Sequence, residues 1–430
     1  MKKWKQKEIN FLKNNYSRLG PKRVSRILGK SYYSVRRKAR DLKLNFSKKY
    51  SWKEEINFLI KRKNSIVDYT KIISTYSENL QESAWNYIMA KQLRNKKKTL
   101  REISQILRVP YQTIKNWASK TTPIPIKIII KLTKLRLLPL IPENTIKFEM
   151  LLKIFSSIFG DGSLNKNLNS VVIAGDYKNL QKFKQQINMS FSGLKIKLDK
   201  KNTKGRFDNR VIEGISGYLS IYDSSLSRLL FAAGSPKGDK VIQKINFPSW
   251  IFSLKRELKA IFIGTLWSQD GTKPLWSKRG FHLSFQLSKS LRLKKEHTRF
   301  MNSIRKIINE FGINTGEVKW KNRPYIRNKD SEKIDKAYFY ISSSAGNYIH
   351  FSKFIPNYSE DRKEIITQTL RKTAATIERN KAQLERFEKF KKMKKEGKSI
   401  NEASKLLGVP YSIVKTWFRG KHRPIDISRR

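Results

Sequence analysis

The chain has 430 residues, which is enough for two to four domains. Lys and Arg number 93 against 34 Asp and Glu, so the formal net charge is +59 and a polyanionic partner, nucleic acid above all, is expected. The absence of cysteine excludes disulfides, thiolate zinc sites and cysteine nucleophiles.

Hydrophobic residues make up 38% of the chain and aromatic residues 11%, which predicts packed domains and not a disordered basic arm. No apolar signal core follows Met1, and lysine and arginine interrupt the most apolar stretch, residues 124–141. We therefore expect a monomer in the reducing cytosol or nucleoid, with no signal peptide and no membrane partner.

The N-terminal segment predicts three short helices. Residues 8–12 (EINFL) follow Trp4, and the same five letters recur at residues 55–59 after Trp52. The pattern resembles the Myb/SANT-like helix-turn-helix of DNA-binding regulators. Its last helix carries the basic residues that we expect to contact DNA, which are Arg36, Arg37, Lys38 and Arg40.

A longer repeat links residues 106–117 (ILRVPYQTIKNW) with residues 406–417 (LLGVPYSIVKTW). In each copy an apolar helix meets a tight turn, and a proline begins a second helix with one apolar stripe and a polar, basic outer face. This is the helix-turn-helix design for entering a DNA major groove, although an ordinary helical hairpin is the alternative. The expected DNA contacts are Gln112, Lys115 and Asn116 in the first copy and Ser412, Lys415 and Arg419 in the second.

The central block, residues 145–372, differs from both ends in its pattern of apolar and polar residues. Alternating segments at 217–222, 281–286 and 338–341 predict antiparallel strands. Helical segments at 180–187 and 297–311 separate them. The fold class expected is therefore α+β, flanked by all-α helix-turn-helix modules at both ends.

Within this block, two apolar segments end in Asp-Gly, at Asp161 and at Asp270. Each predicts a helix stopped by a glycine in the left-handed conformation. A carboxylate is disfavoured at that end, because the helix dipole already places partial negative charge there. Its occurrence twice suggests that two carboxylates are presented together to a metal ion.

Similar elements follow each Asp-Gly (a turn, a strand, a helix, strands and a helix), so we expect two half-domains packed with pseudo-two-fold symmetry. The two helices would pair through small residues, among them Ser156 and Gly264. Two adjacent carboxylates repel unless a cation lies between them, and Mg²⁺ suits carboxylate and phosphate oxygens.

The block resembles the LAGLIDADG homing endonuclease family in its single-chain form. Residues 154–162 (IFSSIFGDG) and 263–271 (IGTLWSQDG) are similar to its two motifs. Residues 229–240 (LLFAAGSPKGDK) and 247–251 (FPSWI) are similar to the segments between them, and residues 358–363 (YSEDRK) to a late segment of the second half. The family usually has a small residue where Gln269 stands, and Trp267 is bulky for a close helix pair.

The resemblance implies the order αββαββα for each half-domain. It also implies a site-specific double-strand DNA endonuclease that uses Mg²⁺, with Mn²⁺ as a substitute. Asp161 and Asp270 would bind the metal together with Gly160 and Gln269, and Lys240 and Lys363 would be the catalytic basic residues. The strands would read DNA from one face of each sheet. Candidates for that face are Asn165, Lys166, Lys273, Lys278, Arg279, Gln286 and Lys319.

Two other functions stay open. A non-catalytic transcription regulator of the WhiA type would also join such a domain to a helix-turn-helix, although two aspartates oppose it. An intron RNA maturase would use the same basic surface, with structured RNA as its partner. The two helix-turn-helix signals favour duplex DNA, because an A-form major groove does not admit such a helix.

The expected domains follow from these features. They are residues 1–45 (Myb/SANT-like), 46–122 (second helical module with helix-turn-helix), 123–144 (linker), 145–252 (first half), 253–372 (second half), 373–392 (helical tether) and 393–430 (C-terminal helix-turn-helix).

Overall fold

The computed structural model describes residues 4–44, 65–143, 145–207, 210–277, 280–358, 360–420 and 424. They divide into two compact units. One holds residues 4–44 and 76–134, and the other holds residues 65–75 and the described residues from 135 onward. No helix in these ranges combines the length and the apolar character that crossing a bilayer requires.

The N-terminal module is built from helices α1 (Gln6–Leu28) and α2 (Tyr32–Asp41). The prediction of three short helices is wrong here, because α1 continues through Pro21. A proline inside a helix removes one backbone hydrogen bond. Leu12 and Val24, on either side of it, are both fully buried in one core with residues of α2, so packing favours the continuous helix. The second EINFL segment lies outside the described residues.

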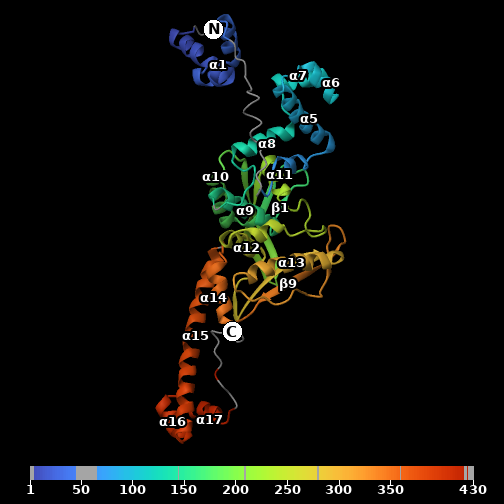
Figure 1. The fold of residues 1–430 in the computed structure, drawn as a ribbon. Helices are drawn as coiled ribbons and strands as arrows, with labels where there is room; N and C mark the ends of the chain where they lie inside the picture. The colour runs from blue at the N-terminus through green and yellow to red at the C-terminus, as the bar shows by residue number, and fades with distance from the viewer. Residues whose placement is uncertain are drawn as a thin grey trace. The chain divides into compact units, whose positions relative to one another are not determined.

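Two three-helix modules share one design. The first consists of α5 (Glu78–Asn95), α6 (Leu100–Leu107) and α7 (Tyr111–Ser119), with α8 (Ile124–Lys134) packed on α5. The second consists of the end of α15 (Glu360–Lys395), α16 (Ile400–Leu407) and α17 (Tyr411–Phe418), all in the larger unit. Both predicted helix pairs are therefore present, and α15 is the long rod that ends at the second pair (Figure 1).

Equivalent residues of these modules lie 300 positions apart, as Pro110 and Pro410 do. Ser104 Oγ donates a 2.7 Å hydrogen bond to the carbonyl of Val109, and Ser404 Oγ donates one of the same length to Val409. Both first helices also begin with a capping box. The sequence repeat is therefore a repeat of local structure.

The larger unit contains two sets of elements that we call the first half and the second half. The first half consists of α9 (Ile146–Phe159), β1 (Gly162–Leu164), β2 (Val171–Asp176), α10 (Tyr177–Ser190), β3 (Ile196–Phe207), β4 (Arg210–Ile221) and α11 (Ser224–Ala232). The second half consists of η2 (Ser249–Ser253), α12 (Arg256–Asp270), β5 (Leu275–Ser277), β6 (Gly280–Ser290), η3 (Leu291–Leu293), α13 (Lys294–Asn309), β7 (Lys319–Trp320), β8 (Tyr325–Ile326), β9 (Lys333–Ile341) and α14 (Ala345–Phe354).

Each half has one antiparallel sheet, so the chain is a mixed α+β protein, as expected. The first sheet has the order β1-β2-β4-β3, and the second has β5-β6-β9-β7 with β8 paired to β9. The three predicted strands lie in β4, β6 and β9, and the two predicted helices lie in α10 and α13. These predictions are confirmed. The strand predictions succeed because alternating apolar residues are typical of strands in a sheet with one buried face.

The segment before α9 belongs to the larger unit as well. Helix α4 (Tyr69–Ile73) packs on α11, and Val67 pairs with Leu140 across an isolated bridge. Residues 65–75 therefore lie with the central block, although the sequence places them in the second helical module.

Helices α9 and α12 lie side by side at the centre of the larger unit (Figure 1). Ten side chains of α9 are buried, and Ser156 Oγ donates a 2.7 Å hydrogen bond to the carbonyl of Phe262 in α12. This arrangement brings the ends of the two helices to one place.

Candidate active site

The C-terminal ends of α9 and α12 touch. The backbone N–H of Asp161 donates a 2.9 Å hydrogen bond to Oε1 of Gln269. A Cβ atom built on Gly160 would lie 2.1 Å from that oxygen and 2.7 Å from Oδ2 of Asp270. The two carboxylates, far apart in sequence, are thus carried on adjoining turns.

The glycines after the two acids do not have the predicted left-handed conformation. Neither Gly162 nor Gly271 has a positive φ, and the backbone at Gly271 is extended. Each is glycine because there is no room for a side chain. A Cβ on Gly162 would lie 2.6 Å from the carbonyl oxygen of Ser157, and one on Gly271 would lie 2.3 Å from Nε1 of Trp267.

The expected pairing through small residues holds for Ser156 but not for Gly264. A Cβ on Gly264 would lie 2.3 Å from the carbonyl oxygen of Pro356, so this glycine makes room for the segment after α14. Trp267 is buried against Phe285 and Phe351 in the second half. Its bulk therefore fills the core of that half.

Lys240 lies at the junction of the two helix ends. Its Nζ donates a hydrogen bond to the carbonyl of Gly160. Burial lowers the pKa of Lys240 to about 8, and the nearby carboxylates of Asp270 and then Asp161 act in the opposite direction. The ammonium group is therefore charged at neutral pH but close to releasing its proton.

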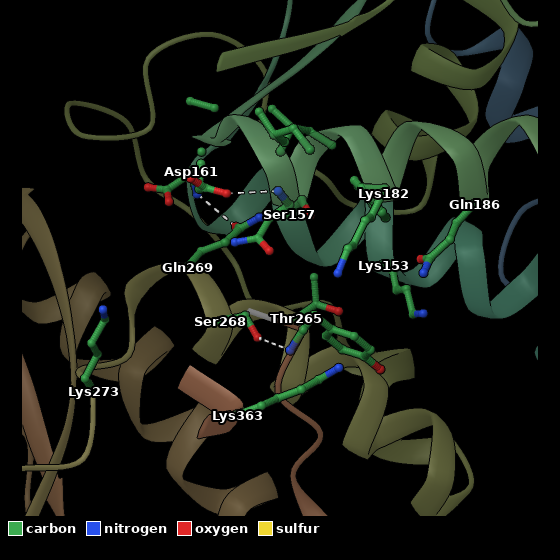
Figure 2. Close-up of a pocket in the computed structure, with 18 residues that line it drawn as sticks. Lys153, Ser157, Asp161, Lys182, Gln186, Thr265, Ser268, Gln269, Lys273 and Lys363 are labelled. Carbon is green, nitrogen blue, oxygen red and sulfur yellow. Dashed lines mark hydrogen bonds between the residues drawn. The ribbon is translucent and has the colours of Figure 1, made fainter. Parts of the chain in front are cut away.

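Lys363 lies across a pocket from Asp161 (Figure 2). It lines this pocket, of about 380 Å³, together with Asp161 and Lys273. Lys153 and Lys182 also line this pocket, so it is strongly cationic. Lys240 thus interacts most strongly with Asp270, and Lys363 shares its pocket with Asp161.

Tyr358 closes part of the same pocket. Burial raises its pKa, and the Nζ of Lys153 lies 4.5 Å from the centre of its ring. The backbone N–H of Tyr358 donates a 3.0 Å hydrogen bond to Ser268 Oγ (Figure 2). Tyr358 is therefore attached to the last turn of α12.

The oxygen atoms gathered here suit a hard divalent cation. Mg²⁺ is usually held by one or two carboxylates, with water and phosphate oxygens completing its shell. Asp161 and Asp270 supply the carboxylates, and Gly160 and Gln269 supply a backbone carbonyl and an amide oxygen. In the described part of the chain, no three His, Cys, Asp or Glu side chains meet at one point. The two carboxylates suit magnesium, whereas the Gly160 carbonyl is bonded to Lys240 and the Gln269 amide oxygen to the N–H of Asp161.

The candidate DNA-reading residues of the core lie on loops and on one sheet face. Gln286 and Lys319 are both register partners of Tyr338, so they share the face opposite Phe285 and Phe339. The other described candidates are exposed loop residues, namely Asn165, Lys166 and Lys273. Lys278 and Arg279 lie outside the described residues.

In the helical modules, most of the candidate residues lie on the exposed face of the second helix. In α2, Val35 and Ala39 are buried, and Arg36, Arg37 and Arg40 are exposed, with Lys38 partly so. In α7, Lys115 is exposed and Gln112 Nε2 donates a 3.1 Å hydrogen bond to Asn116. At the other end of the chain, the exposed or half-buried residues are Ser412, Lys415 and Arg419.

Sequence reasoning missed three residues around Lys240, namely Asp239, Lys289 and Arg327. Asp239 is paired with Arg327 at 2.9 Å, and Lys289 Nζ donates a 2.5 Å hydrogen bond to the Lys240 carbonyl. A signal for Lys289 was present, because it continues the alternation of Leu283, Phe285 and Leu287 and so falls on the core face of a strand.

No protein-family model matches the chain. It is similar to the Replication factor C small subunit of Methanocaldococcus jannaschii, with 25% identity over 235 residues, covering 52% of this chain and 12% of that protein. It is also similar to the tRNA-splicing ligase RtcB of Methanopyrus kandleri, with 27% identity over 186 residues, covering 41% of this chain and 18% of that protein. The chain thus spans less than a fifth of either relative.

Among solved structures, the homing endonuclease I-WcaI bound to its DNA recognition sequence matches 55% of this chain and 92% of its own. The sequence identity is 12% and the TM-score is 0.33. Likeness at this level does not establish a shared function, so what this chain does is inferred from its own residues.

Proposed function

We propose that this chain is a site-specific endonuclease that hydrolyses phosphodiester bonds of duplex DNA with a divalent metal ion, as the LAGLIDADG resemblance implies. The observation that carries the proposal is the meeting of Asp161 and Asp270 at adjoining helix ends, with Lys240 bonded to the carbonyl of Gly160 beside them. A structural role alone gives no reason to place two acids where helix dipoles disfavour them.

Asp161 and Asp270 would hold the metal, with the oxygens of Gly160 and Gln269 beside them. When bound, the metal would polarise the scissile phosphate and stabilise the leaving oxygen. The Lys240 ammonium neutralises charge that develops on the phosphate. Its Nζ, with a pKa of about 8, can also pass a proton to the leaving oxygen near neutral pH. Lys363 would be the basic residue near the scissile phosphate of the second strand.

The helical modules would add affinity for the same duplex. Linking several weak binding modules raises the effective concentration of each at a composite site. With a net charge of +59, binding would fall steeply as salt rises.

The test is cleavage of a plasmid library in Mg²⁺ by the wild-type chain, beside the double variant Asp161→Asn/Asp270→Asn. We expect the wild type to cut at a defined sequence and the variant to bind the same sequence without cutting it. Cleavage that survives the double substitution would refute the catalytic assignment. Tight binding by the wild type without cleavage would favour the regulator, and preferential binding of structured RNA would favour the maturase.

A further inference from the structure

Lys289 is a buried lysine next to the candidate active site. It lies near the end of β6 on the face that carries Phe285, and only 2% of its surface is exposed. Burying an ammonium group is costly unless its hydrogen bonds are made. The Nζ of Lys289 makes a 2.5 Å hydrogen bond to the backbone carbonyl of Lys240. Lys289 is thus bonded to the backbone of Lys240, the residue proposed to act in catalysis.

Lys289 lies among other buried residues. Asp335 is its register partner on β9 and is also buried. His297 lies nearby, stacked on Phe300, and burial together with the charge of Lys289 lowers the pKa of His297 to about 3. His297 is therefore neutral, and among Lys289, Asp335 and His297 only Lys289 can carry a positive charge. Because Lys289 is so deeply buried, it cannot itself contact a DNA phosphate.

The loop that carries Lys240 follows the first half but is held by the second half. Asp239 is paired with Arg327, and the N–H of Ser290 donates a 3.0 Å hydrogen bond to the carbonyl of Val241. Lys289 adds its hydrogen bond to the carbonyl of Lys240, which lies between Asp239 and Val241. Three successive residues of the loop are thus fixed to the second half, and the middle one is Lys240.

We propose that Lys289 is a positioning residue that fixes the backbone of Lys240, so that the Lys240 ammonium reaches Gly160 and Asp270. This inference rests on the proposed nuclease function. It predicts that loss of Lys289 impairs only the DNA strand served by Lys240. The strand served by Lys363 is unaffected, because Lys363 lies in α15, far along the chain from the loop that carries Lys240.

The test uses a duplex with the two strands labelled differently, and the full-length variant Lys289→Met. Methionine keeps the length of the side chain and fills the same buried space without an ammonium group whose burial is costly. We expect cleavage of one strand to slow by about 10- to 100-fold, since misplacement of a reacting group by about 1 Å has such effects. Lys240→Met should slow the same strand, which identifies it. Lys306→Met, which removes an exposed lysine from α13, should leave both rates unchanged.

A second measurement needs no cleavage. In protein without metal or DNA, the amides of Val241 and Ser290 should exchange hydrogen faster in Lys289→Met than in the wild type. Equal slowing of both strands, slowing of the Lys363 strand, or unchanged exchange at these amides would each overturn the inference. If the wild type cuts neither strand, the proposed function fails, and amide exchange alone then decides whether Lys289 fixes the loop.

Discussion

Replacement of Gly160 by alanine asks whether the two helix ends must touch for the chain to act. The added methyl group would lie 2.1 Å from Oε1 of Gln269 and 2.7 Å from Oδ2 of Asp270. Both atoms are at the ends of side chains and can move aside, so the cost to folding should be small. Asp270 would then leave its position, and a misplacement of about 1 Å costs about 100-fold in rate. We expect a loss of DNA cleavage of that size.

Gly264→Ala is the contrasting variant, because its methyl group meets backbone. The carbonyl oxygen of Pro356 would lie 2.3 Å away and the Cγ of the same proline 2.7 Å away. Overpacking of this kind costs about 1–3 kcal/mol. Each kcal/mol lowers the Tm by about 2–4 °C in a large domain. Gly175→Ala is the neutral control, since the nearest atom, on Leu180, would lie 3.7 Å away.

The assay measures two quantities for each variant, the cleavage rate at saturating DNA and Mg²⁺ and the Tm by circular dichroism. Gly160→Ala should lose rate with little change in Tm, and Gly264→Ala should lose Tm. Wild-type cleavage by Gly160→Ala would refute the reasoning, because Asp270 would then tolerate displacement. A fall in Tm as large as that of Gly264→Ala would refute it as well.

Two other predictions concern the helical modules. Lys115→Met and Lys415→Met should weaken DNA binding without abolishing cleavage at saturating DNA. Each should reduce the slope of log K against log salt by about 0.9, because one phosphate contact is lost. An unchanged slope would contradict a phosphate contact by that lysine. Lys91 is buried in α5, and burial lowers its pKa to about 8, whereas in the unfolded chain it keeps its proton up to about pH 10.5. The unfolded state therefore binds more protons between these values, and stability due to this group rises with pH there. Thermal melting should show that Lys91→Met is more stable than the wild type at pH 7 and that its advantage shrinks by pH 10; a constant difference would contradict the role of the charge.

Sequence reasoning identified the two helix ends that meet, because its signals were local. The Asp-Gly pairs at Asp161 and Asp270 break a rule of helix ends, and such a conflict can be read from a few neighbouring residues. The alternation within β6 and β9 likewise marks strands without knowledge of their partners. These features led to the two helix ends that meet in the structure.

What the sequence could not supply was the identity of partners distant along the chain. Gly264 looks like a helix-pairing residue, yet its neighbour is Pro356, and only the path of the chain after α14 decides this. Gly162 suits a left-handed cap equally well in sequence, but the observed reason for glycine is the closeness of the Ser157 carbonyl. Pro21 would end a helix by local rules, and packing on both sides of it overrides them.

The two repeated modules share a scaffold but not a reading surface. At equivalent positions, Gln112 and Asn116 in α7 present amides, whereas Ser412 and Thr416 in α17 present hydroxyl groups. Amides can pair with adenine through two hydrogen bonds, and a hydroxyl group cannot. The shared Lys115 and Lys415 suit phosphates, which carry no sequence information. If both modules bind one duplex, they would therefore contact its phosphates in the same way but read different bases, and the target would be asymmetric.

The halves of the core are also unlike, since Gln269 precedes one acid and Gly160 the other. If the core and the modules bind one duplex as proposed, these unequal halves and unequal modules would favour one orientation on the DNA.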